Sequence, residues 1–237
     1  MVDFKRRHRS REYMDEASAA GEDLVRALRE LELVNRFLGG TRASIDALFE
    51  MVPEGGTAPL YILDLGMGAG DIPAAIAMRA RRRAMSVKIA AVDFNPAVCA
   101  WARKRWAHIP EVEFLQADVF ALPFTADSFD IVHSAMFLHH FPQTEAAHLF
   151  DIMYDLCRCG VIINDLHRHA LAYYSIKWLT SLFSHSAMVR HDGPLSVLRG
   201  FSRPDLEDLG NMAGINRANA FAIEWRWAFR YVLSARK

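Results

Sequence analysis

One apolar run followed by three closely spaced glycines constrains the fold of this chain more than any other stretch. Residues 60–65 read Leu-Tyr-Ile-Leu-Asp-Leu, and Gly66, Gly68 and Gly70 follow before Asp71. The run is typical of a strand in a buried parallel sheet, and glycine lets the chain turn sharply and a ligand approach the backbone. Because open α/β sheets bind ligands beyond the carboxyl ends of their strands, the turn predicts a nucleoside-bearing cofactor there.

The glycine spacing and the neighbouring carboxylates indicate which cofactor binds. A dinucleotide fingerprint has the pattern G-x-G-x-x-G, and its helix N-terminus receives a pyrophosphate. Here the third glycine comes one residue early, and Asp71 stands where the phosphate would lie. A carboxylate at a helix start opposes a bound anion, whereas Asp64 and Asp71 together suit a cation. S-adenosylmethionine carries an ammonium and a sulfonium group and no phosphate, so the turn favours this cofactor over a nicotinamide dinucleotide.

Further along the chain, the hydrophobic pattern alternates between strands and helices. We expect strands near residues 60–65, 87–92, 112–117, 129–134 and 159–165, and helices near 71–83, 96–107, 143–156 and 203–213. Two last strands, near 218–225 and 227–234, are joined too tightly for a helical crossover. The pattern predicts an α/β fold with a Rossmann-like, doubly wound, mostly parallel seven-stranded sheet and an antiparallel C-terminal hairpin.

Two regions are expected to flank this sheet. Helical periodicity over Glu22–Leu38 and from Ser44 to Val52 predicts an N-terminal helical cap. Residues 1–56 would then form a tail and cap, and residues 57–237 the main domain. The first eleven residues are basic, and we expect a solvated tail. An aromatic-rich helix at 171–183 predicts a lid helix, within an insertion at about 167–200.

Composition limits the classes of protein to consider. The 237 residues carry no net formal charge, which argues against nucleic acid as the main partner. Cys99, Cys157 and Cys159 match neither a disulfide framework nor a zinc pattern. No signal peptide and no apolar run of about 20 residues is visible, so we expect a cytoplasmic protein without stable membrane insertion. An oligomer is compatible with this composition.

The second expected strand ends in an acidic residue suited to a ribose. Asp93 lies roughly twenty residues past the glycine turn, where a carboxylate can accept both vicinal hydroxyl hydrogens. Phe94 beside it is a candidate for the adenine face. The alternative role, a helix N-cap before Pro96, favours Asn95, and both roles are compatible.

The third and fourth strands complete the predicted cofactor site. Asp118 is a candidate acceptor for the adenine amino group while the Val119 amide meets a ring nitrogen; the alternative is a plain loop aspartate. Ser134 ends the fourth strand beside the cofactor. The candidate cofactor-binding residues are Asp64, Gly66, Gly68, Asp93, Phe94, Asp118, Val119 and Ser134.

Four features in this order resemble the class I S-adenosylmethionine-dependent methyltransferases: the glycine turn, Asp93, Ala117-Asp118, and Phe129-Asp-Ile-Val132 followed by Leu138-His-His140. The likeness is closest to the small-molecule branch that includes the quinone-biosynthesis methyltransferases, and it covers residues 58–165. The resemblance implies that Asp64, Gly66 and Gly68 contact the methionine end, Asp93 the ribose and Asp118 the adenine. Met67 departs from the family, which often has a small or polar residue there, so its side chain must point away from the cofactor.

The residues after strands four and five constrain the methyl acceptor. Amino-directed nucleic-acid methyltransferases usually carry an Asn/Asp-Pro-Pro-aromatic motif after the fourth strand, and here that place reads His133-Ser-Ala-Met136. Metal-dependent catechol methyltransferases need an Asp after strand four and an Asp-Asn type pair after strand five. Only the pair after strand five has a partial match here, in Asn164-Asp165. One carboxylate with one amide makes a poor magnesium site. We therefore expect no metal ligands and a metal-independent reaction.

A phenol has a pKa of about 10, so a base near neutrality would help methyl transfer to its oxygen. The candidates follow strands four and five or lie in the lid: His139, His140, His167, His169 and His191. We expect His167 as base with Asp165 as its orienter, because period two places both on one side of an extended chain. His191 with Asp192, in a presumed lid loop, is second. The alternative is that these histidines cap helices or bind solvent.

The lid predicts the class of acceptor. The side chains expected to enclose it are Tyr173, Tyr174, Trp178, Phe183, Met188 and Leu195; the alternative is packing of the lid helix against the cap. We expect methyl transfer to a hydroxyl of a small hydrophobic aromatic, such as a phenolic, polyketide or quinol-like compound of secondary metabolism. The alternatives are carbon methylation of a quinol-type ring and a non-catalytic adenosyl-binding module.

Overall fold

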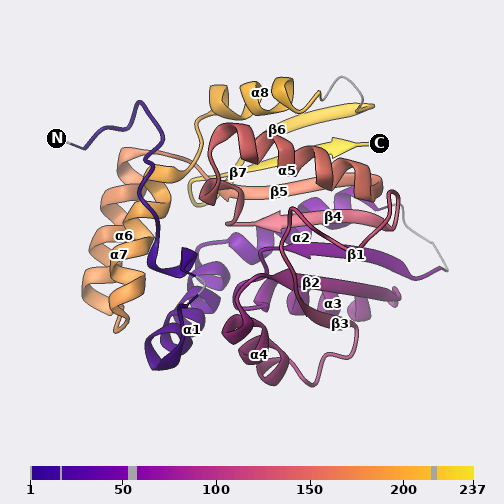
Figure 1. Ribbon diagram of the computed structural model, residues 1–237, viewed down its shortest axis with the longest axis horizontal. Helices are drawn as coiled ribbons and strands as arrows, with labels where there is room; N and C mark the ends of the chain where they lie inside the picture. The colour runs from indigo at the N-terminus through magenta and orange to yellow at the C-terminus, as the bar shows by residue number, and fades with distance from the viewer. Residues whose placement is uncertain (1, 17, 53–57, 215–217) are drawn as a thin grey trace.

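The apolar run at residues 60–65 forms an interior strand of a sheet in the computed structural model, which describes residues 2–16, 18–52, 58–214 and 218–237 (Figure 1). β1 (Leu60–Leu65) pairs in parallel with β2 (Val87–Asp93) on one edge and β4 (Phe129–Ala135) on the other. The strand order is β3-β2-β1-β4-β5-β7-β6. The outer strands are β3 (Val112–Gln116), β5 (Cys157–Leu166), β6 (Ala220–Arg226) and β7 (Arg230–Arg236).

The two C-terminal strands form the predicted antiparallel hairpin. β7 pairs antiparallel with β5 on one side and β6 on the other. Only residues 227–229 connect β6 to β7, so no helical crossover fits between them. The expected fold, a mostly parallel seven-stranded sheet with an antiparallel edge, is confirmed.

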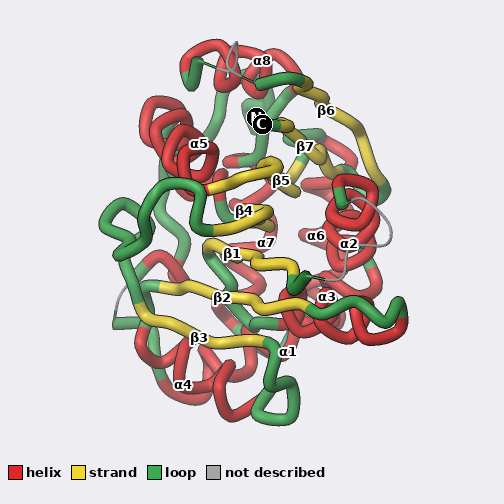
Figure 2. Tube along the Cα trace, turned by 90° about the vertical axis from the view of Figure 1, so that its right-hand side faces the viewer, coloured by secondary structure: helices red, strands yellow, loops and turns green. Residues whose placement is uncertain are grey.

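Helices cover both faces of the sheet, which explains the unbroken apolar run in β1. Ile62 packs in one buried cluster with α2 (Gly40–Met51), α3 (Asp71–Arg82) and α4 (Pro96–Arg105). Leu63, the next residue, packs in the opposite cluster with α5 (Gln143–Leu156) and α8 (Arg203–Met212). Figure 2 shows α2 and α3 on one side of the strands and α5 on the other. Successive side chains of a strand point to opposite faces, so both must be apolar here.

Three further helices stand beside the carboxyl ends of the parallel strands. These are α1 (Gly21–Phe37), α6 (Ala170–Phe183) and α7 (Ala187–Arg199), and Figure 1 shows them next to the N-terminal segment. The prediction of a lid loop around His191 was wrong, because residues 187–199 are helical. Ser186 caps α7 by accepting a hydrogen bond from the Val189 amide at 3.3 Å. Pro194 lies inside this helix, where it and its neighbours are buried.

The prediction of a solvated tail was also wrong, because the basic N-terminal segment is held against the rest of the protein. The Arg7 guanidinium lies 4.1 Å above the Phe201 ring and donates to the carbonyls of Arg199 (2.8 Å) and His139 (3.1 Å). The His8 amide donates to the Leu198 carbonyl at 3.0 Å. Burial lowers the pKa of Arg7 to about 10. A run of basic residues does not reveal acceptors that only distant elements supply.

The N-terminal helices share a hydrophobic core with the sheet. Leu24 and Leu28 of α1 and Leu48 of α2 belong to the same buried cluster as Ile62 and Ile131. The proposed boundary between residues 56 and 57 falls on positions outside the described residues, so the division into two units stays a prediction. None of the helices in the described ranges is both long and apolar enough to cross a membrane.

The packing of α2 yields the first testable prediction. Leu48→Ala should lower the free energy of unfolding by about 2–5 kcal/mol, because Leu48 is fully buried between α2 and the sheet. Leu33→Ala, at a position that is 52% exposed, should change it by no more than about 0.5 kcal/mol. Urea unfolding of both variants measures the difference. Equal values would mean that α2 is not part of the cooperative core.

Candidate active site

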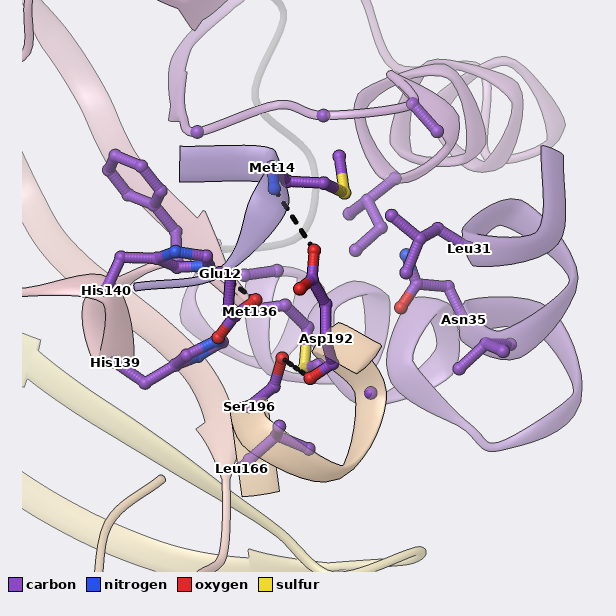
Figure 3. Close-up of a pocket in the computed structure, with 18 of the residues that line it drawn as sticks. Glu12, Met14, Leu31, Asn35, Met136, His139, His140, Leu166, Asp192 and Ser196 are labelled. Atoms are coloured by element: carbon purple, nitrogen blue, oxygen red, sulfur yellow. Dashed lines mark hydrogen bonds and ion pairs between the residues drawn. The ribbon is translucent and has the colours of Figure 1, made fainter. Parts of the chain in front are cut away.

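A cavity of about 790 Å³ opens beyond the carboxyl ends of the parallel strands. Its walls come from the ends of β1, β2, β4 and β5, from α1, α6 and α7, and from the N-terminal segment (Figure 3). The predicted cofactor residues that line it are Asp64, Gly66, Gly68, Asp93, Phe94, Asp118 and Val119. The structure therefore brings together seven of the eight candidates.

The glycine turn forms the floor of this cavity. Gly66 has φ +71°, and a Cβ at this position would overlap the ring of Phe137, so a side chain is excluded by both backbone and space. Gly68 has φ +49°, and no heavy atom lies within 4 Å of the place where its Cβ would stand. That open space beside the Gly68 backbone is where a ligand can approach closely.

Asp93 is held in place at the end of β2 by two backbone amides. Its carboxylate accepts hydrogen bonds from Gly68 at 3.2 Å and from Asn95 at 3.0 Å, and burial raises its pKa. Asn95 caps α4 by accepting from the Ala97 and Val98 amides, as the alternative role required. Phe94 is 41% exposed and lines the cavity. Asn95 therefore takes the N-cap role, and the ribose role of Asp93 stays a prediction.

Asp118 and Ser134 differ in how they meet the cavity. Asp118 lines it, and its carboxylate accepts from the Phe120 amide at 2.9 Å. The prediction that Ser134 lies beside the cofactor was wrong, because Ser134 is fully buried and is absent from the described lining. Its hydroxyl donates to the Leu65 carbonyl at 3.1 Å. Its hydroxyl serves the β1–β4 pair within the sheet.

Asp64 belongs to a buried polar chain that the sequence did not reveal. Its carboxylate lies 2.5 Å from His133 Nδ1, and His133 Nε2 lies 2.9 Å from the Ser44 hydroxyl. The Asn164 amide donates to that hydroxyl at 2.9 Å and to the Gly40 carbonyl at 2.9 Å. The chain joins α2 to three strands and orients the carboxylate that lines the cavity.

Asp71 and Arg230 provide buried charges of opposite sign in the cavity. Asp71 is only 7% exposed, and burial raises its pKa to about 7. Asn35 donates to one oxygen at 3.4 Å, while Asp71 Oδ2 has no hydrogen-bond partner in the described structure. Arg230 is 2% exposed and has no carboxylate partner among the residues described. An orphaned carboxylate oxygen in a cavity fits a cationic ligand group, as the acidic mouth predicted.

Comparison with known proteins identifies the domain. Residues 62–160 match the family model described as "Methyltransferase domain", and this match spans β1 to β5, whose ends carry the site. Residues 62–160 are therefore similar to a methyltransferase domain, which agrees with the class I S-adenosylmethionine-dependent family that the sequence resembles.

Among curated proteins, a demethylmenaquinone methyltransferase of Thermus thermophilus is 35% identical over 123 residues, 49% of this chain and 51% of that protein. This chain thus spans about half the length of the curated relative that it matches. A solved S-adenosylmethionine-dependent methyltransferase of Aquifex aeolicus has a TM-score of 0.63 at 15% identity, covering 91% of this chain and 99% of that one. Magnesium protoporphyrin IX methyltransferase of Synechocystis, solved with bound S-adenosylmethionine, has a TM-score of 0.56 at 15% identity over 93% and 99%. The two structural likenesses concern the fold.

The predicted pair of His167 and Asp165 is not formed in this methyltransferase domain. Asp165 Oδ1 lies 2.6 Å from His139 Nδ1, and Asp165 Oδ2 accepts from the His139 amide at 3.1 Å. His167 comes after the last residue of β5, and its Nδ1 accepts a hydrogen bond from Trp225 Nε1 at 3.3 Å. Burial lowers the pKa of His167. The described cavity lining includes neither His167 nor Asp165.

His191 is paired as expected but lies outside the described lining. Its Nδ1 is 2.7 Å from Asp192 Oδ1, and the Tyr13 ring stacks on it at 4.0 Å. Asp192 itself lines the cavity, where its carboxylate accepts from the Tyr13 and Met14 amides (Figure 3). The N-terminal segment therefore uses the Asp192 carboxylate as an anchor.

Glu12, His139 and His140 line the cavity together, and the sequence singled out only the two histidines. Glu12 Oε1 lies 3.5 Å from His139 Nε2, and both residues are buried. Burial alone would lower the pKa of His139, but Asp165 and Glu12 raise it to about 9. Glu12 sits in a basic, polar stretch of sequence that carries no sign of a site. Only the fold of the N-terminal segment across the cavity places it there.

The prediction that six lid side chains enclose the acceptor was also wrong. Tyr174, Trp178 and Phe183 are 56%, 61% and 67% exposed. None of the six predicted aromatic and aliphatic lid residues appears in the described lining. The helices instead present smaller residues, among them Ala172, Ile176 and Leu179 of α6 and Val189 and Val197 of α7. The apolar side chains that the lid helices turn toward the cavity are therefore aliphatic and not aromatic.

Asp71 should make cofactor binding depend on pH. The cationic methionine end of S-adenosylmethionine favours the ionised carboxylate, whose pKa is about 7 in the ligand-free protein. Affinity should therefore fall as pH drops below 7, by at most about tenfold per pH unit for one proton. Asp71→Asn should bind more weakly at pH 8 and lose this dependence.

Calorimetric titration with S-adenosylmethionine from pH 8 to pH 6 measures the affinity. Asp208→Asn, at an exposed position of α8, is the matched control. The pKa of Asp71 lies above its ordinary value of 3.8, so its ionisation destabilises the ligand-free fold as pH rises. Asp71→Asn should therefore raise the melting temperature at pH 8. An unchanged pH profile in this variant would show that Asp71 does not face the cofactor.

Proposed function

We propose that this protein transfers the methyl group of S-adenosylmethionine to a hydroxyl of a small, apolar aromatic compound. The observation that carries the proposal is that a single cavity has two walls of different chemistry. One wall holds the glycine turn with Asp93 and Asp118, and the other holds aliphatic side chains of α1 and α6, among them Leu31 and Ile176. Its volume of about 790 Å³ lies near the upper end of small-molecule sites, about 300–1,000 Å³, which leaves room for an acceptor beside the cofactor.

The cofactor would lie over the glycine turn with its charged groups on buried partners. S-adenosylmethionine supplies an activated methyl group on a sulfonium, so most of the protein's work is placement of the acceptor. Asp93 would receive the ribose hydroxyls, and Asp118 with the Val119 amide the adenine. Asp71 and Asp64 would face the ammonium end. The unpaired guanidinium of Arg230 would face the carboxylate of the methionine end.

The proton of the acceptor hydroxyl would leave toward the cluster of Glu12, His139 and His140. This cluster lines the cavity, whereas His167, His191 and Asp165 do not belong to its described lining. Asp165 keeps a role as the partner that orients His139. The Asn164-Asp165 pair considered for magnesium is engaged within the protein, which supports a site without magnesium at that place.

Carbon methylation of a quinol-type ring is the second candidate, and the name of the Thermus relative favours it. The same cavity and the same proton acceptor would serve, because loss of a ring hydroxyl proton activates the ring carbon. We place the reaction in the cytoplasm and in secondary metabolism, on a small molecule and not on nucleic acid. A non-catalytic adenosyl-binding module is the remaining alternative.

A panel of phenols and quinols with labelled S-adenosylmethionine tests the proposal. We expect label in an O-methyl group, identified by mass fragmentation of the product. Label on a ring carbon would establish the second candidate. Cofactor binding without transfer to any member of the panel would favour the non-catalytic module.

Asp93→Ala tests the cofactor site separately from the acceptor. At a concentration of 100 times Kd, S-adenosylmethionine should stabilise the wild-type protein by about 2.7 kcal/mol. The variant should lose most of this gain, because Asp93 is the carboxylate placed for the ribose. Asp208→Ala should keep it. A full thermal shift in Asp93→Ala would remove the ribose assignment.

A further inference from the structure

Three side chains at one wall of the cavity direct ligand atoms at the same small space. Glu12 Oε1 is 3.5 Å from His139 Nε2, and Glu12 Oε2 is 3.9 Å from His140 Nε2. One ligand atom from each of the three residues lies within 4.8 Å of the other two. Figure 3 shows the Glu12 carboxylate facing the two histidines. Glu12 is 4% exposed and His139 2%.

Two of these atoms make no hydrogen bond in the described structure, and their ion-pair contacts are long: 3.5 Å between the two, and 3.6 Å from Glu12 Oε1 to Arg199. Glu12 Oε1 and His139 Nε2 are buried and make no hydrogen bond there. A buried polar atom without a partner costs about 1–3 kcal/mol, and here two such atoms face each other. We propose that Glu12, His139 and His140 bind one divalent transition-metal ion, which would satisfy both.

The surroundings of the two imidazoles match those of metal-binding histidines. His139 Nδ1 is 2.6 Å from Asp165 Oδ1, and His140 Nδ1 pairs with Asp15 Oδ1. With a proton on each Nδ1 held by its carboxylate, each Nε2 would offer its lone pair to the ion; at His139 the ion would first displace the proton that the raised pKa keeps on the ring. Metal-binding histidines in general donate their second ring nitrogen to a carboxylate or carbonyl in this way.

The local charge is compatible with a divalent cation. Glu12, Asp15 and Asp165 are three carboxylates; Arg199 lies against the first two, and Arg7 interacts electrostatically with Asp165. Arg199 NH1 is 2.6 Å from Asp15 Oδ2 and 3.6 Å from Glu12 Oε1. Arg7 donates to the backbone carbonyl of His139. With neutral imidazoles this group carries one net negative charge, so a divalent ion and one bound hydroxide or phenolate would bring it to zero.

The ligand set indicates the kind of metal. Two imidazole nitrogens and one carboxylate oxygen suit Zn²⁺ and its first-row neighbours, and three protein ligands leave coordination positions open. Mg²⁺ and Ca²⁺ prefer oxygen ligands. This inference departs from the metal-independent reaction expected from the sequence, because that expectation considered only oxygen ligands at Asn164-Asp165. Glu12, 127 residues before His139, lay outside any recognisable metal spacing.

Resting on the proposed function, the ion would act as a Lewis acid on the acceptor. A metal-bound hydroxide would take the proton of the acceptor hydroxyl and leave as water, and the resulting phenolate oxygen would bind the metal. That oxygen would then form the bond to the methyl carbon while the carbon–sulfur bond breaks and its electron pair stays on sulfur. The metal keeps its oxidation state, so no redox partner is needed.

Cobalt titration of the chelator-treated protein tests the site without any methyl transfer. We expect one equivalent of Co²⁺ to bind with visible d–d absorption, and Zn²⁺ to displace it. Glu12→Gln and His140→Gln should each weaken Zn²⁺ binding by at least about tenfold. His185→Gln, an exposed histidine away from the cavity, is the matched control and should bind as wild type. Circular dichroism checks that each variant is folded.

X-ray absorption of the zinc-loaded wild-type protein gives a second readout that needs no variant, and it should show two imidazole ligands. Less than one equivalent of Co²⁺, or full Zn²⁺ affinity in Glu12→Gln, would overturn the proposal and indicate an ion pair between Glu12 and His139. Cofactor binding to the metal-free protein is measured in parallel. Retained cofactor binding without metal binding would refute the metal site alone, and metal binding without transfer to any acceptor would refute the proposed function alone.

Discussion

β1 pairs in parallel with β2 along one edge and with β4 along the other, so the chain leaves the centre of the sheet in opposite directions. Such a reversal opens a crevice at the carboxyl ends of the central strands. The groups of the candidate site that the central strands carry follow from that geometry. The glycine turn ends β1, Asp93 ends β2, and His139 and His140 follow β4. Parallel pairing therefore sets where this protein can bind a ligand.

The crevice is stabilised by polar contacts that the apolar core cannot supply. The chain from Asp64 through His133 and Ser44 to Asn164 joins α2 to the strands whose ends carry the site. Asp71 shows the opposite arrangement, since burial raises its pKa and one oxygen lacks a partner in the described structure. The partners of Asp64 orient a carboxylate at the cavity wall, whereas Asp71 leaves one oxygen there free for a ligand.

The N-terminal segment completes the cavity wall that the sheet leaves open. Arg7 and Asp15 attach it to α7 and to the residues after β4, and Asp192 accepts from two of its amides. These contacts bring Glu12 against His139. The segment is thus part of the proposed acceptor and metal site, although its composition is that of a solvated tail.

The sequence by itself determined the sheet, the hairpin and seven residues that line the cavity, because these depend on local periodicity, turn chemistry and the rule that parallel strands bind ligands at their carboxyl ends. Asp93 and Asp118 could be placed at the cavity since each follows the end of a strand. The partner of Asp165, the face that α6 turns inward and the position of Glu12 could not. These depend on side-chain direction and on contacts between separate elements, 26 residues apart for Asp165 with His139 and 127 for Glu12 with His139. Only the tertiary structure decides which distant groups compensate one another once water is excluded.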